Sequence, residues 1–298
     1  MQEKFRPIAT PTKTVEIMRK YDIKMKKSLG QNFLIEPQIL EKMIESAHID
    51  KQTTVVEIGP GIGALTEYLA RNAKEVFAFE IDQRFVEILK ETLSDYHNIN
   101  IIPQDILKIN FKDTSFEKLR NANRLVVVAN LPYYITTPII MHLMNSELPF
   151  DSLVMMMQKE VAERMTAQIG TKEYNSLTIA LSNQMKAELA FIVPKSVFIP
   201  KPNVDSAVLK LIRRNQPLEK VDNTEEFERF VQLAFKQRRK TIWNNYRSYF
   251  IPGVLTIEQL ENVFEETEID RQLRAEALSV HEFATLYREV KKYIKHLR

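Results

Sequence analysis

Short apolar segments alternate with helical patterns from residue 53 to about residue 130, and this alternation constrains the fold most strongly. Similar segments follow later, and the last two have no obvious helix between them, so they are candidates for an antiparallel edge pair. Near-continuous apolar strands separated by helices predict an α/β fold, with a mostly parallel sheet covered by helices on both faces. The expected strands are TTVVEI (53–58), EVFAFE (75–80), NINIIPQD (98–105), RLVVVAN (124–130), SLVMMMQ (152–158), AELAFIVP (187–194) and DSAVLKLIR (205–213).

A polar, proline-containing segment, RRNQPLEKVDN (213–223), marks a domain boundary. Beyond it the apolar residues recur only at three-to-four spacing, which is typical of amphipathic helices. We therefore expect a small all-α domain at the C-terminal end. The predicted divisions are an N-terminal extension (1–23), an α/β domain (24–215) and a helical domain (216–298).

Three of the six glycines, Gly59, Gly61 and Gly63, fall within five residues in the segment EIGPGIGALT. The segment follows an expected strand and opens an expected helix. Glycines allow a ligand to approach the backbone closely, and helix N–H groups attract polar ligands at the same place. A plain strand–helix turn needs only one glycine, so we expect a ligand loop. With Ala64, the loop also satisfies the dinucleotide pattern G-x-G-x-x-G/A, so the loop alone leaves the ligand open.

Four polar residues, Glu57, Glu80, Asp105 and Asn130, each end an expected strand, and 23, 25 and 25 residues separate them. The carboxyl ends of strands line the ligand crevice of an open α/β sheet, so we expect one cleft. Glu57 is expected to orient the glycine loop, Glu80 to accept hydrogen bonds from ribose hydroxyls, and Asp105 to contact an adenine. The alternatives are a solvated strand-end acid for Glu80 and a turn cap for Asp105.

The segment NLPYY suits an exocyclic amine of an aromatic base. The lone pair of such an amine is delocalised, and two acceptors holding its N–H groups would localise it. The Asn130 side chain and the Leu131 carbonyl are the expected acceptors. Pro132 stiffens the turn, so the acceptors are preorganised, and Tyr133 offers a ring for stacking. The alternative is a strand-exit turn with a partly buried aromatic residue.

Charge and composition narrow the class of protein. The first 30 residues carry eight Lys or Arg against three acids, and residues 229–247 are basic with no acid. Such segments predict a polyanionic partner, although solvated helix faces would look the same. The chain has no cysteine, and its five histidines lack ligand spacing, so we expect no metal site. No apolar run suits a membrane span or a secretory signal, so we expect a cytoplasmic protein.

Seven motifs together resemble those of the KsgA/RsmA family of small-subunit rRNA adenine dimethyltransferases, a branch of the Rossmann-like S-adenosylmethionine (SAM) methyltransferases. The similarity runs from about Lys24 onward. Departures are Trp243 and Asn244, and Ala275 where the family often has proline. The motifs are KKSLGQNFL (26–34), VVEIGPGIGALT (55–66), FEID (79–82), QDILK (104–108), NLPYYITTPII (130–140), FIPKPNVDSAVL (198–209) and FKQRRKTIWNN (235–245).

The resemblance implies roles for individual residues. Residues 24–215 would form the SAM-dependent methyltransferase domain, with SAM as cofactor and no metal. Phe198 would clamp the target base with Tyr133. The implied catalytic residues are Asn130, Leu131, Pro132, Tyr133 and Phe198. The implied cofactor-binding residues are Asn32, Leu34, Gly59, Gly61, Glu80, Ile81, Asp105, Ile106 and Asn130. The expected RNA-binding residues are Lys26, Lys27, Arg238, Arg239 and Lys240.

The activity implied is dimethylation of two adjacent adenosines near the 3′ end of 16S rRNA, within an immature 30S subunit, by a monomeric enzyme. Three alternatives remain open. An Erm-type enzyme would dimethylate one adenosine of large-subunit rRNA. A ribosome-assembly factor would act mainly by binding. A nicotinamide-dependent oxidoreductase would explain the glycine loop but not NLPYY.

Overall fold

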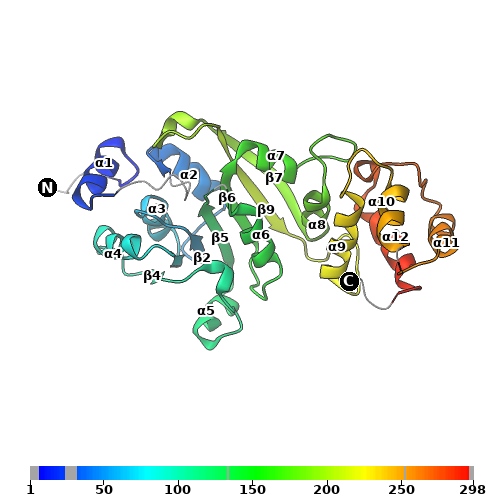
Figure 1. The fold of residues 1–298 in the computed structure, drawn as a ribbon. Coiled ribbons are helices and arrows are strands. Elements are labelled where there is room, and N and C mark those ends of the chain that lie inside the picture. Colours follow the sequence, from blue (N-terminus) through cyan, green and yellow to red (C-terminus); the bar gives the residue numbers. More distant parts are fainter. Residues whose placement is uncertain (1–6, 24–31, 133, 252, 295–298) are drawn as a thin grey trace. The chain divides into compact units, whose positions relative to one another are not determined.

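The computed structural model describes residues 7–23, 32–132, 134–251 and 253–294 (Figure 1). Two compact units divide the chain: residues 1–162 with 188–212, and residues 163–187 with 213–298. The division differs from the sequence-based boundary because residues 163–187 join the second unit. Helix α8 (Ser176–Gln184) packs against α9 (Thr224–Ala234) there.

The first unit contains a seven-stranded sheet of order β4-β3-β2-β5-β6-β9-β7. Strands β2 to β6 pair in parallel, and β9 pairs antiparallel with β6. Strand β7 lies at the edge beside β9, as the missing helix between them predicted. The strands are β2 (Thr54–Ile58), β3 (Glu75–Phe79), β4 (Ile99–Ile102), β5 (Leu125–Asn130), β6 (Ser152–Gln158), β7 (Met185–Val193) and β9 (Ser206–Arg213).

Helices cover both faces of the sheet, which confirms the predicted fold class. Val55, Val76 and Val126 point to one face and join the core formed with α2, α3 and α4. Residues of opposite parity point to the other face, where Phe79 meets the rings of Phe111 and Phe116. The helices of this part are α2 (Pro37–Ser46), α3 (Ala64–Asn72), α4 (Gln83–Thr92), α5 (Glu117–Arg120) and α6 (Thr136–Met144), and α7 (Lys159–Met165) spans the boundary between the two units.

The strand order reverses beside β2. The chain runs outward from β2 through β3 to β4, and then crosses back to β5 on the other side of β2. Ligands of open α/β sheets bind outside the carboxyl ends of the strands at such a reversal. The fold therefore places a binding crevice beyond the ends of β2 and β5.

The described part of the N-terminal extension packs on the first unit. Helix α1 (Pro11–Lys20) begins after Thr10, whose side chain caps it. Ile8 and Ile17 are buried in the core shared with α3 and α4. The Ile8 N–H donates to the Glu67 carboxylate at 2.9 Å, in the first turns of α3. This segment is therefore part of the domain core.

The second unit is helical, which confirms the predicted all-α C-terminal part. An aromatic cluster forms its core: the rings of Phe230 and Tyr246 stack at 4.6 Å, and Tyr287 meets Phe230 edge-on at 5.6 Å. Besides α8 and α9, the helices are α10 (Ile242–Phe250), α11 (Ile257–Thr267) and α12 (Val280–Lys291).

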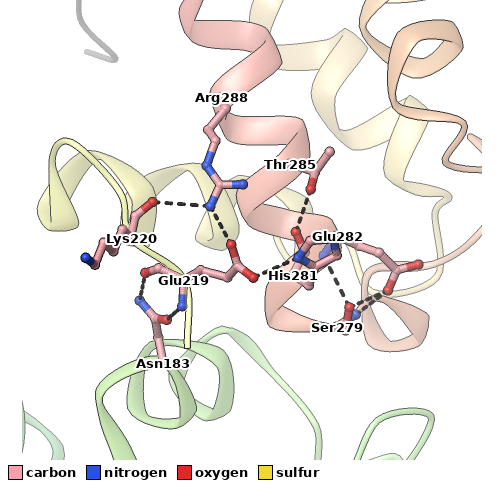
Figure 2. Close-up of polar contacts among 8 residues, drawn as sticks. All are labelled: Asn183, Glu219, Lys220, Ser279, His281, Glu282, Thr285 and Arg288. Carbon is pink, nitrogen blue, oxygen red and sulfur yellow. Dashed lines mark hydrogen bonds and ion pairs between the residues drawn. The ribbon is translucent and has the colours of Figure 1, made fainter. Parts of the chain in front are cut away.

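Polar contacts anchor the segment that leads into α9 (Figure 2). The Glu219 backbone N–H donates to the Asn183 side chain at 2.8 Å, which ties the segment to α8. The Glu219 carboxylate lies 2.7 Å from His281 Nδ1 and accepts from Arg288, both on α12. These two partners lower the pKa of Glu219, the His281 hydrogen bond more than the Arg288 one.

Among the described helices, none combines the length and the apolar composition that crossing a membrane requires.

Candidate active site

The glycine loop takes a backbone shape that other residues adopt rarely. Gly61 and Gly63 have φ values of +57° and +93°, in the left-handed region. A Cβ atom on Gly63 would lie 3.2 Å from the Leu89 and Leu93 side chains, so this glycine allows α3 to pack closely on α4. Gly61 instead lies against the ring of Phe33 and lines a cavity.

A cavity of about 210 Å³ lies at the carboxyl ends of β2, β3 and β5. Twelve of the predicted catalytic and cofactor-binding residues line it together, although they come from segments far apart in the sequence. They are Asn32, Leu34, Gly59, Gly61, Glu80, Ile81, Asp105, Ile106, Asn130, Leu131, Pro132 and Phe198. Tyr133 lies outside the described residues, as do Lys26 and Lys27.

Glu80 holds the glycine loop against the end of β3. Its carboxylate accepts the Gly61 N–H at 3.1 Å and the Asp82 N–H at 2.8 Å. The side chain is only 6% exposed, and burial raises its pKa, while the two backbone hydrogen bonds act in the opposite direction. We expected Glu57 to orient the glycine loop, but the hydrogen bond to the loop comes from Glu80.

Glu57 forms a buried wall of the cavity. It is 1% exposed, and burial raises its pKa to about 8. The neighbouring Thr66 hydroxyl acts on this pKa in the opposite direction, and the nearby Glu80 adds a smaller increase. Among the described residues, no hydrogen-bond partner reaches its Oε2 atom or the buried Thr66 hydroxyl. Buried polar atoms without partners are rare in native structures and point to a missing polar or cationic ligand. This wall therefore fits a polar ligand group, and a cation bound there would favour the ionised form of Glu57.

Asp105 serves as a turn cap and also faces the cavity. Its Oδ1 atom accepts the Leu107 N–H at 3.1 Å and caps the short 3-10 helix Ile106–Lys108. The capping alternative is thus realised, and the carboxylate still lines the cavity beside Ile106.

The turn after β5 is held by hydrogen bonds at several points. The Leu131 N–H donates to the Met156 carbonyl at 3.2 Å, which continues the sheet past Asn130. The Pro132 carbonyl accepts the Ile135 N–H at 3.2 Å and the Thr136 hydroxyl at 3.4 Å. These hydrogen bonds fix both ends of the turn, and the ring of Pro132 restricts the backbone at its own position.

A small two-stranded sheet brings two distant motifs to the cavity. Strands β1 (Phe33–Leu34) and β8 (Phe198–Ile199) pair antiparallel, with Leu34 opposite Phe198. Phe198 is 4% exposed, so its ring is part of the cavity wall.

Sequence reasoning missed several lining residues, and Phe33, Gln104 and Tyr134 are three of them. Phe33 covers Gly61 and meets Phe85 edge-on at 6.0 Å. All three lie inside the motifs named above, next to predicted site residues, so their position in the sequence could have indicated that they line the cavity.

The basic residues Arg238, Arg239 and Lys240 are exposed between α9 and α10 of the second unit. Arg238 donates to the Lys172 carbonyl and lies 3.8 Å from the Glu276 carboxylate, so its charge is partly engaged. The described residues contain no group of three or more His, Cys, Asp or Glu side chains able to hold a metal ion.

Comparison with known proteins decides the family. Residues 22–291 match the profile described as "Ribosomal RNA adenine dimethylase". The protein belongs to the ribosomal RNA adenine dimethylase family. It is therefore an rRNA adenine methyltransferase, and its Rossmann-like sheet is the methyltransferase fold of that family.

Individual relatives agree with this assignment. "Ribosomal RNA small subunit methyltransferase A" of Staphylococcus aureus strain Newman is 51% identical over 286 residues, 96% of each chain. The protein of the same name from Staphylococcus epidermidis strain ATCC 12228 is 50% identical over 289 residues, 97% of this chain and 98% of the other.

Two solved structures share the fold. A dimethyladenosine transferase from Plasmodium falciparum superposes with a TM-score of 0.72 at 30% identity, covering 87% of this chain and 98% of the other. The 23S rRNA methyltransferase ErmE superposes with a TM-score of 0.65 at 25% identity, covering 87% and 99%.

Proposed function

We propose that the protein uses SAM to dimethylate the exocyclic amines of two adjacent adenosines near the 3′ end of 16S rRNA, as a step in small-subunit biogenesis. One observation carries the proposal: the NLP turn, the glycine loop and three acidic strand ends line the same cavity. An oxidoreductase would need the glycine loop but not this turn. Small-subunit relatives share 50–51% identity, against 25% for the 23S enzyme, which favours 16S rRNA over large-subunit rRNA.

The acidic strand ends suit the cofactor. SAM supplies an electrophilic methyl group on a sulfonium cation. Glu80 would accept hydrogen bonds from its ribose, and Asp105 with Ile106 would contact its adenine. Asn32 and Leu34 would cover its methionine end, beside the buried acid Glu57. Gly59, Gly61 and Ile81 would complete the contact surface.

The turn after β5 suits the target amine. Asn130 and the Leu131 carbonyl would hold its two N–H groups, so that the nitrogen lone pair is no longer delocalised into the ring and points at the methyl group of SAM. As the N–CH₃ bond forms, the S–CH₃ bond would break and release S-adenosylhomocysteine, and the cationic, acidic amine would lose its proton to water. Pro132 keeps these acceptors in place, and catalysis by positioning requires no general base of shifted pKa. Phe198, together with Tyr133, would clamp the base after it leaves its stack.

The exposed cations suit the RNA backbone. Arg238, Arg239 and Lys240 would neutralise phosphates, together with Lys26 and Lys27, so affinity should fall steeply with salt. The expected partner is an immature 30S subunit in the cytoplasm, bound by a monomer.

Mass spectrometry of methylated particles tests the proposal. Purified protein and SAM are incubated with 30S and 50S subunits from cells that lack this modification. We expect dimethylation at two adjacent adenosines of 16S rRNA and none in 50S-derived RNA. Unmodified 16S rRNA after incubation would refute the proposal, and methylation of 50S-derived RNA would favour the Erm-type alternative.

A further inference from the structure

Two exposed apolar side chains stand on the rim of the cavity. Among the large apolar residues that the structure describes, Ile81 and Tyr134 have the highest exposures, 72% and 61%. They follow different strands, β3 and β5, yet both line the same cavity. Exposed apolar surface gathered at a cavity mouth indicates a surface that a partner covers. Ile81 belongs to the proposed cofactor contacts, whereas Tyr134 has no assigned role.

The described residues on either side of Tyr134 are held by burial and hydrogen bonds, while its own ring is open to solvent. Leu131 is 2% exposed, and the Pro132 carbonyl accepts the Ile135 N–H on the far side of Tyr134. Helix α6 begins directly afterwards, at Thr136. An aromatic ring on such a turn loses little conformational entropy when it binds a planar partner, since only two side-chain torsions are restricted.

We propose that Tyr134 stacks on the nucleotide next to the adenosine that occupies the cavity. This assignment rests on the proposed function, because it needs an RNA strand whose target base has entered the cavity. The neighbouring base then remains outside, at the rim where Tyr134 stands. Base–aromatic stacking needs only a π-face and tolerates any base.

Stacking also suits two adjacent targets. Dimethylation removes both N–H donors from an adenine amine, so a rim that recognised that amine by hydrogen bonds would bind a finished neighbour poorly. A ring that stacks accepts the neighbour before and after its methylation. Tyr134 would therefore hold the neighbouring adenosine at the rim whether or not that neighbour has already been methylated.

Four variants separate stacking from other roles: Tyr134→Ala, Tyr134→Leu, Tyr134→Phe and Tyr134→Trp. Tyr293→Ala, which truncates a tyrosine 37% exposed in the second unit, is the matched control. Steady-state methylation of unmodified 30S particles gives KM and kcat for each variant. Isothermal titration with S-adenosylhomocysteine gives the affinity of the cofactor site independently of activity.

We expect Ala and Leu to raise KM for the particles about 5- to 100-fold, the range for loss of one base–aromatic stack. Phe and Trp should stay within roughly twofold of the wild type, because both keep the ring face. The affinity for S-adenosylhomocysteine should not change in any variant, and Tyr293→Ala should behave as the wild type.

Four results would overturn the assignment. If Leu performs as well as Tyr, the residue is only apolar cover, and if Phe fails as Ala does, the hydroxyl is the active group. Weakened S-adenosylhomocysteine binding would place Tyr134 in the cofactor site, and unchanged KM in all four variants would leave it without a role. If the wild-type protein itself methylates no particle, the proposed function fails instead, so the two failures are distinguishable.

Discussion

Replacing Glu80 tests whether one carboxylate both shapes the glycine loop and binds the cofactor. In the structure it accepts the Gly61 N–H at 3.1 Å and the Asp82 N–H at 2.8 Å while only 6% exposed. Hydrogen bonds to a charged group contribute about 1.5–3 kcal/mol each, and a buried donor left unpaired costs about 1–3 kcal/mol. Glu80→Gln keeps one acceptor oxygen and turns an NH₂ group toward the other donor, whereas Glu80→Ala loses both acceptors.

Glu80→Ala should destabilise the fold more than Glu80→Gln. Burial of the Glu80 carboxylate carries a desolvation cost, which is also what raises its pKa. Removing the carboxylate removes this cost, and the gain partly offsets the lost hydrogen bonds. We expect the free energy of unfolding to fall by about 1–2 kcal/mol for Gln and by about 2–4 kcal/mol for Ala. Loss of the ribose contact should weaken S-adenosylhomocysteine about 10- to 100-fold in both.

Urea unfolding without ligand and isothermal titration with S-adenosylhomocysteine measure the two effects separately. Glu75→Gln is the matched control, because Glu75 begins the strand β3 that Glu80 follows, and it contacts only Asn100 and Lys118 in the hydrogen bonds described. Its titration should match the wild type. An unchanged urea midpoint in Glu80→Ala would refute the loop-holding role, and an unchanged affinity would refute the ribose contact.

Three further predictions address the turn, the buried acid and the N-terminal segment. Asn130 is implied both to bind the cofactor and to hold the target amine, and we expect the second role to dominate. Asn130→Ala should therefore leave S-adenosylhomocysteine affinity near wild type but slow methyl transfer about 10²–10³-fold, the usual cost of a lost preorganised polar contact; collapse of affinity would contradict this division of roles. Burial raises the pKa of Glu57 to about 8, from an ordinary value of 4.5, so its proton stabilises the fold at low pH and that stability is lost as pH rises through 8. Urea unfolding at pH 6 and pH 9 should therefore show that the free energy of unfolding falls less between these pH values for Glu57→Gln than for the wild type. Equal decreases would show that Glu57 does not titrate in this range. Glu67→Ala leaves the Ile8 N–H without its acceptor, so we expect the free energy of unfolding to fall by about 1–3 kcal/mol and the amides of residues 8–20 to exchange hydrogen faster. Unchanged exchange would mean that this contact does not hold the segment.

Much of the fold and of the site was predictable because the signals are local. Apolar strands of 4 to 9 residues and the helical periods between them are written in consecutive residues, so the parallel sheet and the helical C-terminal part followed from pattern alone. The spacing of Glu57, Glu80, Asp105 and Asn130 predicted a shared cleft, because successive parallel strands end at the same edge. The motif resemblance added Asn32, Leu34 and Phe198, which no spacing argument connects to that cleft.

Other features depend on contacts between distant residues, and only the tertiary structure decided them. The hydrogen bond from Gly61 to Glu80, rather than to Glu57, follows from how β2 and β3 pair. Leu34 and Phe198 meet because two short strands pair across the chain, and α8 joins the helical unit because its apolar face packs on α9. The exposure of Tyr134 likewise follows from the way its turn leaves the sheet. Sequence by itself determined which segments become strands and helices and which polar groups end them, since these depend on neighbouring residues. Packing decided which groups touch, because burial and hydrogen bonding are settled between segments that the chain order keeps apart.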